Sequence, residues 1–318
     1  MATQNPPRVL TGEIAPVLRS IETVIVGKPE AVEQTLVAVL AGGHLLVEDV
    51  PGVGKTTLAR ALARSIGGSF SRVQCTPDLL PGDVTGVHVL DQRQGTFVFQ
   101  PGPIFANVVL ADELNRATPR TQAALLEAME ERQVTLEGTT RPLPNPFLVI
   151  ATQNPVELEG TFPLPEAQLD RFLLRLRIGY PNEQDELELV DRFASAAPLD
   201  EVMPVLDLPH LIALIRSVRD IRVEPSIRQY VVALVRGTRE HASVRLGASP
   251  RATLALFHAA QAQAAIRGRT FVVPDDVKSL AGPVLSHRLL LTSQARLRGR
   301  TELTVLADIV AATPVPVE

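Results

Sequence analysis

The sequence predicts an α/β fold, with a mainly parallel sheet covered by helices and a smaller helical domain behind it. Up to about Tyr180, short apolar strands alternate with helical segments, an order that is typical of parallel sheets. After Pro181 the strand patterns mostly stop and helical patterns follow. We therefore expect two domains, at residues 1–182 and 183–318.

The first domain is expected to alternate helices and strands. Apolar residues recur at helical spacing from Pro29 to Leu40, and proline suits a first helical turn. The stretch "HLLVE" (44–48) then predicts a short buried strand, followed by a loop and a helix that runs to about Ser65. Further strands are predicted in "SFSRVQ" (69–74), "NVVLADE" (107–113), "PFLVIATQ" (146–153) and "RFLLRLRI" (171–178), with a helix in "PRTQAALLEAMEER" (119–132).

Two segments interrupt this alternation and predict β-hairpins, because each alternates apolar and polar residues around a glycine-containing turn. They are "VHVLDQRQGTFVFQ" (87–100) and "RQVTLEGTTRPLP" (132–144). The second domain shows four helical patterns: "EQDELELVDRFAS" (183–195), "LPHLIALIRSVRD" (208–220), "SIRQYVVALVRGTREH" (226–241) and "SPRATLALFHAAQAQAAIRG" (249–268).

Composition narrows the classes of function. A net charge of -4, a pI near 5.9 and the absence of Trp argue against a general nucleic-acid binder with an aromatic stacking surface. The single Cys75 excludes an intramolecular disulfide and a cysteine zinc cluster, and the six histidines show no ligand spacing. The N-terminus "MATQNPPRVL" lacks the pattern of a signal peptide, and the longest apolar stretch (36–47) is too short to span a bilayer. We therefore expect a cytoplasmic protein without membrane insertion.

The stretch "PGVGKTT" (51–57) has the residues of a phosphate-binding loop. Such a loop needs backbone N–H groups at a helix N-terminus and a lysine that reaches the outer phosphates. Gly52 and Gly54 permit a tight backbone, Lys55 supplies the cation, and Thr56 offers a hydroxyl to Mg2+. Asp49 replaces the first glycine of the usual G-x-x-x-x-G-K-[ST] pattern. The loop tolerates that side chain if it points away from the nucleotide.

An acidic pair, Asp112 and Glu113, lies at the C-terminal end of the predicted strand "NVVLADE". The carboxyl ends of parallel strands form the edge at which an open α/β sheet binds ligands. At that edge Asp112 would hold the Mg2+ shell, and Glu113 would orient and deprotonate an attacking water. Without the preceding phosphate loop, the same pair would indicate only a solvated loop.

Three further residues are candidates for contacts with phosphate. Asn154 follows the strand "LVIATQ" and either positions the water or forms a turn before Pro155. Arg171 precedes the last strand, and Arg251 lies in the first turn of a predicted helix. The helix dipole does not stabilise an arginine near the start of a helix. Arg251 therefore either binds a specific anionic partner or is an ordinary surface residue.

These five elements together resemble a AAA+ ATPase, and in detail the MoxR family, from about Val24 to about Thr292. The matching wording is "EDVPGVGKTTLARALA", "LADELNRATPRTQAALLEAMEERQVT", "ATQNPVELEGTFPLPEAQLDRFLLR" and "GASPRA". The resemblance implies a AAA+ P-loop αβα core with two hairpin insertions and a helical lid domain. MoxR-like proteins are also similar in carrying an acidic residue at the place of Asp49.

The resemblance assigns roles to individual residues. It implies that Asp49–Thr56 is Walker A, that Asp112 and Glu113 are Walker B, and that Asn154 is sensor 1. Arg171 would be an arginine finger and Arg251 sensor 2. The expected nucleotide contacts are Val26 and Gly27 in "VIVGK", together with Pro51, Gly52, Val53, Gly54, Lys55, Thr56 and Thr57. Thr56 and Asp112 would hold Mg2+, and Glu113, Asn154, Arg171 and Arg251 would be the catalytic residues.

The function that the resemblance implies is ATP hydrolysis in a homo-oligomeric ring, a hexamer, in which Arg171 of one subunit completes the site of its neighbour. It further implies chaperone-like maturation of protein clients, often together with proteins that contain a von Willebrand factor A domain. One alternative is the motor subunit of a metal (magnesium) chelatase, which a tetrapyrrole-binding partner would favour. Others are a nucleotide-dependent scaffold without turnover, which a phosphate-release assay tests, and a DNA-remodelling motor, which the acidic balance disfavours.

Overall fold

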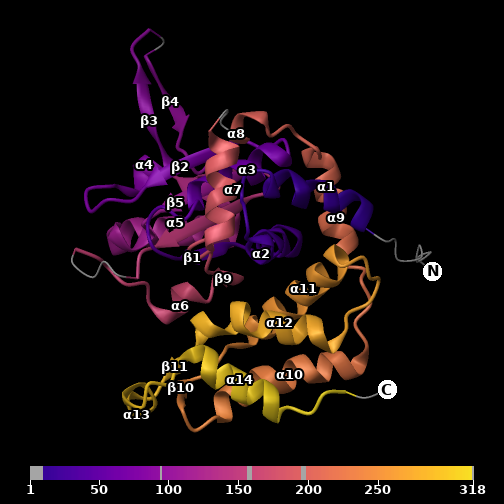
Figure 1. Cartoon of the computed structure of the whole chain (residues 1–318). Helices are drawn as coiled ribbons and strands as arrows, with labels where there is room; N and C mark the ends of the chain where they lie inside the picture. Colours follow the sequence, from indigo (N-terminus) through magenta and orange to yellow (C-terminus); the bar gives the residue numbers. More distant parts are fainter. Residues whose placement is uncertain (1–9, 94, 156–159, 195–197, 317–318) are drawn as a thin grey trace, which may run out of the picture.

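The computed structural model describes residues 10–93, 95–155, 160–194 and 198–316, and Figure 1 shows the whole chain. Apart from Leu10, the stretch considered above for a signal peptide lies outside these residues. In the described part of the chain, no helix has the length and apolar character needed to cross a membrane.

A five-stranded parallel sheet forms the centre of the first domain, which confirms the predicted α/β fold. The strand order is β2-β5-β8-β1-β9. The strands are β1 (Leu45–Glu48), β2 (Phe70–Gln74), β5 (Val108–Asp112), β8 (Leu148–Gln153) and β9 (Leu174–Leu176). The predicted apolar runs therefore all form strands of one sheet, although β9 is shorter than the run that predicted it.

Helices cover both faces of this sheet. Along β5 and β8, Val108, Leu110 and Ile150 belong to one buried cluster, and Val109 and Val149 belong to another. Successive strand residues point to opposite faces, so a strand covered on both sides is a continuous apolar run. The first cluster includes residues of α1 (Thr11–Glu22), α2 (Pro29–Ala41) and α3 (Lys55–Ser65), and the second includes residues of α5 (Pro119–Glu131).

Both predicted hairpins are present, and they touch each other. The long hairpin β3–β4 projects from the core in Figure 1, after the short helix α4. His88 Nδ1 of this hairpin lies 3.1 Å from Glu137 Oε2 of the second hairpin, β6–β7. The Arg141 guanidinium carbon of the second hairpin lies 4.1 Å from the centroid of the Phe99 ring. The elements are α4 (Pro81–Thr85), β3 (Gly86–Asp91), β4 (Thr96–Pro101), β6 (Gln133–Leu136) and β7 (Thr139–Pro142).

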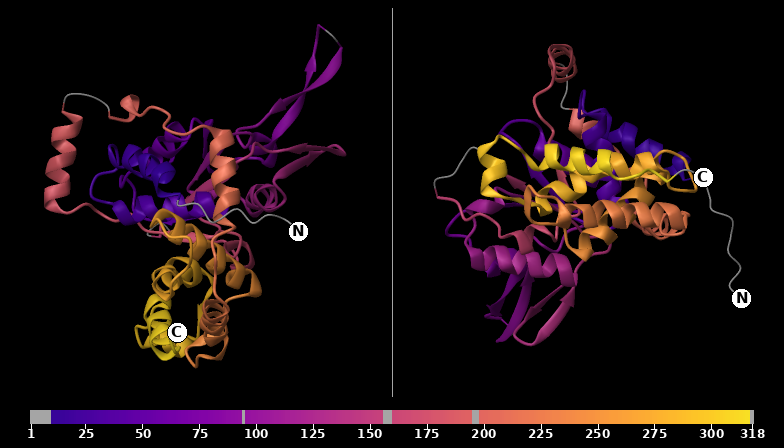
Figure 2. Two further views of the ribbon diagram at one scale, coloured as in Figure 1. Left: turned by 90° about the vertical axis from the view of Figure 1, so that its right-hand side faces the viewer. Right: turned by 90° about the horizontal axis from the view of Figure 1, so that it is seen from below.

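After β9, the described chain is helical apart from one short antiparallel pair, β10–β11, and an isolated bridge between Arg222 and Phe271. In Figures 1 and 2, α10–α14 form a separate layer of helices beside the core, whereas α7 stands against the phosphate-loop side of it. The bounds are α6 (Glu166–Leu169), α7 (Glu183–Phe193), α8 (Pro198–Glu201), α9 (Leu208–Val218), α10 (Pro225–Glu240), β10 (Val244–Leu246), α11 (Pro250–Ile266), α12 (Pro274–Leu285), β11 (Leu290–Leu291), α13 (Ser293–Leu297) and α14 (Glu302–Ala312). Two 3-10 turns, η1 (Leu114–Arg116) and η2 (Ser286–Arg288), complete the described elements.

Candidate active site

The loop between β1 and α3 has the conformation that a phosphate-binding loop requires. Gly52 and Gly54 have φ values of 86° and 92°, in the left-handed region that favours glycine. Lys55 is the first residue of α3, so the N-terminus of this helix faces the loop. Backbone N–H groups at such a helix start attract anions.

The side chain of Asp49, which stands in place of the usual first glycine, is held away from the loop. The Asp49 side chain is buried, and its carboxylate accepts hydrogen bonds from Ile178 N and Gly179 N, each at 2.7 Å, and from Val50 N at 2.9 Å. The condition stated from the sequence is therefore met, because this side chain is turned to the segment after β9. In that position the carboxylate anchors the loop.

A cavity of about 390 Å³ brings together two of the four predicted catalytic residues, Glu113 and Asn154, with residues predicted to bind phosphate and Mg2+. Its lining includes Lys55 and Thr56 at the start of α3, the pair Asp112 and Glu113 at the end of β5, and Asn154 after β8. The Lys55 ammonium donates to Asp49 O at 2.7 Å and to Val50 O at 3.3 Å, which keeps it at the loop. Thr56 and Asp112 offer oxygen ligands beside this lysine, which is the donor type that Mg2+ prefers.

Neighbouring side chains hold both carboxylates of the acidic pair. Asp112 Oδ1 accepts from Thr152 Oγ1 at 2.6 Å, and Asp112 Oδ2 accepts from Arg72 Nη2 at 2.6 Å. Glu113 Oε2 accepts from Gln74 Nε2 at 3.0 Å and lies 3.1 Å from Arg116 Nη1. The sequence analysis missed these four partners.

The signal for two of the missed partners was present in the sequence. Arg72 and Gln74 alternate at the end of β2, so they lie on the same face of a strand that pairs with β5. Arg72 Nη2 also donates to Gln74 Oε1 at 2.7 Å, which joins the two carboxylates through one chain of hydrogen bonds. The order of the strands, which places β2 beside β5, could not be read from local patterns.

Cys75 follows this strand and is buried. Burial, and then the nearby Asp112 and Glu113 carboxylates, raise the pKa of its thiol to about 12. A thiol that stays protonated is a poor nucleophile, so Cys75 is a small buried side chain rather than a catalytic group.

A largely apolar cavity of about 430 Å³ adjoins the phosphate loop. Val26 is one wall, and Leu189 and Phe193 of α7 form another, which the sequence analysis did not anticipate. Gly27 has φ of 69°, in the left-handed region that favours glycine, and a Cβ atom there would lie 2.0 Å from Asp185 Oδ2 of α7. A side chain at this position would therefore be strained and would displace the Asp185 carboxylate.

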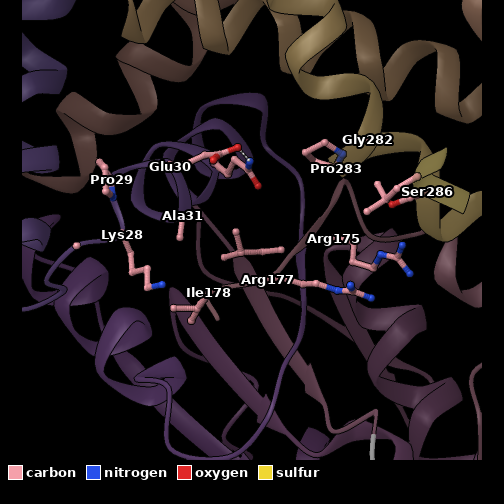
Figure 3. Close-up of a pocket in the computed structure, with 14 residues that line it drawn as sticks. Lys28, Pro29, Glu30, Ala31, Arg175, Arg177, Ile178, Gly282, Pro283 and Ser286 are labelled. Atoms are coloured by element: carbon pink, nitrogen blue, oxygen red, sulfur yellow. Dashed lines mark hydrogen bonds between the residues drawn. The ribbon is translucent and has the colours of Figure 1, made fainter. Parts of the chain in front are cut away.

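A third cavity, of about 510 Å³, lies between the core and the helical layer (Figure 3). In the figure, Lys28 and Arg177 extend from the core side, and Pro283 and Ser286 lie at the ends of α12 and η2 opposite them. These cations have partners, because Lys28 Nζ donates to Tyr180 O at 2.7 Å and Arg177 Nη2 lies 3.8 Å from Glu48 Oε2. The cavity separates the two layers on this side.

Arg171 and Arg251 meet at one carboxylate of α5. Arg171 Nε lies 3.1 Å from Glu130 Oε2, and Arg251 Nη2 donates to Glu130 Oε1. Arg251 lies in the first turn of α11, as predicted. Neither arginine is among the described residues that line the cavity of Lys55 and Glu113. The structure therefore brings the two arginines together at a place apart from the phosphate loop.

The core and the helical layer each match a known protein family. Residues 44–174 match the ATPase family associated with various cellular activities (AAA), and residues 236–309 match the AAA lid domain. The chain is 49% identical to the uncharacterized protein YeaC of Bacillus subtilis, over 100% of this chain and 98% of that protein. It is 44% identical to Chaperone MoxR1 of Mycobacterium tuberculosis, over 86% of this chain and 75% of that protein.

The chain belongs to the MoxR family of AAA+ ATPases. Protein MoxR of Methylorubrum extorquens is 34% identical, over 92% of this chain and 91% of that protein. A solved structure from Cytophaga hutchinsonii, described as a candidate ATPase, has a TM-score of 0.91 and 36% identity, with 97% of this chain and 96% of that chain covered. The protein is thus a MoxR-type ATPase with a AAA core and a helical lid.

Proposed function

We propose that this ATPase assembles into a hexameric ring, hydrolyses ATP at the subunit boundaries and uses the lid motion to mature or remodel protein partners. One observation supports the shared site most directly. Lys55 and Glu113 line one cavity, whereas Arg171 and Arg251 lie together on Glu130. A phosphoryl transfer site gains rate from an arginine that stabilises charge on the transferred group. A second copy of the chain would supply that arginine.

The residues of the cavity divide the chemistry among them. Lys55 and the backbone of Gly52 and Gly54 bind the phosphates, and Glu113 takes the proton of the attacking water. Asn154 orients that water. Mg2+, when held by Thr56 and Asp112, neutralises phosphate charge. Each step uses a group that lines this one cavity.

The nucleobase is proposed to bind between "VIVGK" and α7. Val26 and Phe193 line the apolar cavity beside the phosphate loop, so a planar base would bury its faces there. Helix α7 follows directly on the proposed domain boundary at residues 182–183. Closure of this helix over the base would couple nucleotide binding to the second domain.

Partner proteins are proposed as the object of the motion. The relatives include a protein named Chaperone MoxR1, which supports a chaperone-like role. A partner with a von Willebrand factor A domain is the first candidate for such a client complex. A cytoplasmic location is proposed with it. Capture on the Glu113→Gln variant in the presence of ATP would identify the client, because slow turnover prolongs the ATP-bound complex.

Hydrolysis itself is tested at Glu113. Glu113→Gln preserves the shape and the hydrogen-bonding oxygen but removes the base, so ATP should bind while phosphate release falls about 10²-fold or more. Release close to the wild-type rate would exclude Glu113 as the catalytic carboxylate. The matched control is Glu240→Gln, which removes an exposed lid carboxylate that pairs with Arg236.

The shared site is tested by mixing two inactive variants. Arg171→Ala should bind ATP and assemble but hydrolyse slowly, because fingers of this kind contribute about 10³–10⁵ in rate. A Lys55→Ala subunit should not bind ATP in its own site, but it retains Arg171. Mixed rings should regain activity that neither variant has alone. If subunit exchange is confirmed and no activity returns, Arg171 does not act on a neighbouring subunit.

A further inference from the structure

The lid residue Arg288 makes an extensive set of hydrogen bonds with the segment that contains Arg171. Its side chain is 3% exposed. Its guanidinium donates to Asp170 Oδ1 at 2.7 Å, Asp170 O at 3.2 Å, Phe172 O at 2.6 Å and Leu173 O at 3.2 Å, and also to Val284 O. An arginine carries five N–H donors in a rigid fork, so this group is close to its full capacity. Four of the five acceptors belong to residues 170–173.

Two other lid residues contact the same segment. Ser249 Oγ donates to Asp170 Oδ2 at 2.8 Å, and His287 Nε2 lies 3.1 Å from Phe172 O. Ser249 is the N-cap of α11, the helix that carries Arg251 in its first turn. The Asp170 carboxylate therefore joins η2 to the start of α11. Because Asp170 precedes Arg171 in the chain, this carboxylate links the helix that carries Arg251 to the backbone beside Arg171.

These contacts lie on both sides of Arg171. The carbonyl groups of Asp170 and Phe172 are held by the same guanidinium, which fixes the backbone before and after Arg171. The Arg171 side chain is then directed to Glu130. The cavity of Figure 3 lies between α12 and the residues that follow β9. The Arg288 hydrogen bonds thus tie the lid to residues 170–173 of the core.

We propose that Arg288 is a positioning residue that makes the lid and residues 170–173 one rigid unit and so sets the direction of Arg171. This inference rests on the proposed role of Arg171 at the neighbouring site. Movement of the lid in one subunit would then move the finger that the same subunit presents to the next. Communication around the ring would pass through this buried guanidinium.

The test removes both charges of the clamp at once, because a buried arginine left without its carboxylate destabilises a fold. The double variant Asp170→Asn/Arg288→Met should keep ATP affinity within about twofold, while kcat falls about tenfold or more at unchanged KM, because small misplacements of catalytic groups are costly in rate. Mixing with Lys55→Ala should restore activity in part, since the Lys55→Ala subunits keep a correctly held finger. A kcat close to wild type would overturn the proposal.

A matched control separates positioning from loss of stability. Asp276 is fully buried in the lid and binds Arg269 through two contacts of 2.6 Å, without touching residues 170–173. Arg269→Met/Asp276→Asn should lower the melting temperature in a similar way but retain kcat. If this control loses kcat as much as the clamp variant, Arg288 has no special role in positioning Arg171.

Two single variants keep the proposal testable if the double variant does not fold. Ser249→Ala removes the hydrogen bond to Asp170 Oδ2 together with the N-cap hydrogen bond from Ala252 N, and it retains both charges, so kcat should fall a few-fold with ATP affinity unchanged. An unchanged kcat in Ser249→Ala would then reject the proposal. Arg171→Ala in the same assay tests the role of Arg171 separately from that of Arg288. If Arg171→Ala retains kcat, Arg171 is not an arginine finger. If only Arg171→Ala loses kcat, Arg171 is the finger but Arg288 does not position it.

Discussion

At the scale of single residues, Lys55 is the group on which we expect nucleotide binding to depend most. Its ammonium is already held at the loop by the carbonyl groups of Asp49 and Val50. Lys55→Ala should reduce ATP affinity below the range of a calorimetric titration, because the cation that meets the outer phosphates is lost. The control Lys278→Ala removes a lid lysine that pairs with Asp275. A near-normal affinity for Lys55→Ala would contradict the phosphate-loop assignment.

His44 makes the stability of the core sensitive to acid. Burial, and then the nearby Arg132 guanidinium, lower the pKa of His44 to about 4. Its neutral ring is matched to its surroundings, because Nδ1 accepts from Val149 N at 3.0 Å and Nε2 lies 3.0 Å from Met129 O. Since the unfolded pKa is about 6.5, the unfolded chain binds an extra proton between pH 6.5 and pH 4.

The sign of this effect is fixed by the lowered pKa. The contribution of His44 is complete above about pH 6.5 and is lost as the pH falls towards 4. From pH 7.5 to pH 5 the free energy of unfolding should fall by about 2 kcal/mol through His44 alone. Urea unfolding of His44→Asn should show a correspondingly smaller fall. Burial also lowers the pKa of His287, so that residue adds to the wild-type slope in the same direction.

The residues around the acidic pair show what local sequence patterns miss. Lys55, Asp112 and Glu113 were predicted because each follows or begins an element with a recognisable pattern. Arg72 and Gln74 were missed, since their role depends on the pairing of β2 with β5 rather than on their neighbours in the chain. A contact between strands is set by sheet order, which a single sequence does not state.

At the scale of elements, the strands of the sheet were predictable because their apolar runs are covered on both faces. Helix α1 (Thr11–Glu22) was not predicted, although Ile14, Val17 and Ile21 have helical spacing. The position of α7 was also beyond the sequence. Its pattern indicates a helix, but only the fold places it beside the phosphate loop.

Helix α7 offers a test of the nucleobase site with an internal control. Leu189 and Phe193 lie four residues apart on one face and line the apolar cavity, whereas Leu187 is 62% exposed. Leu189→Ala should weaken ATP binding about tenfold, because the base loses apolar contact area. Leu187→Ala should leave the affinity of a fluorescent nucleotide analogue unchanged. Equal effects of the two variants would place the base elsewhere.

At the scale of the whole molecule, the core residue Glu130 binds Arg251 of the lid as well as Arg171 of the core. A nucleotide phosphate that attracts Arg171 and Arg251 would compete with this carboxylate. Arg251→Ala should therefore reduce the difference between the ATP and ADP forms in small-angle scattering or limited proteolysis. Arg236→Ala, an exposed lid arginine that pairs only with Glu240 among the described ion pairs, is the control. An undiminished difference would make Arg251 a surface charge.

The hydrogen bonds of the Asp49 carboxylate limit how this loop can be redesigned. Restoring the consensus glycine would remove the acceptor of Ile178 N and Gly179 N, and a buried donor left unsatisfied costs about 1–3 kcal/mol. The same two residues line the apolar cavity, so the repair would loosen the base site as well. The acidic residue and the turn after β9 therefore form one hydrogen-bonded unit, and a loop grafted without the acidic residue would leave the two N–H groups of that turn without this acceptor.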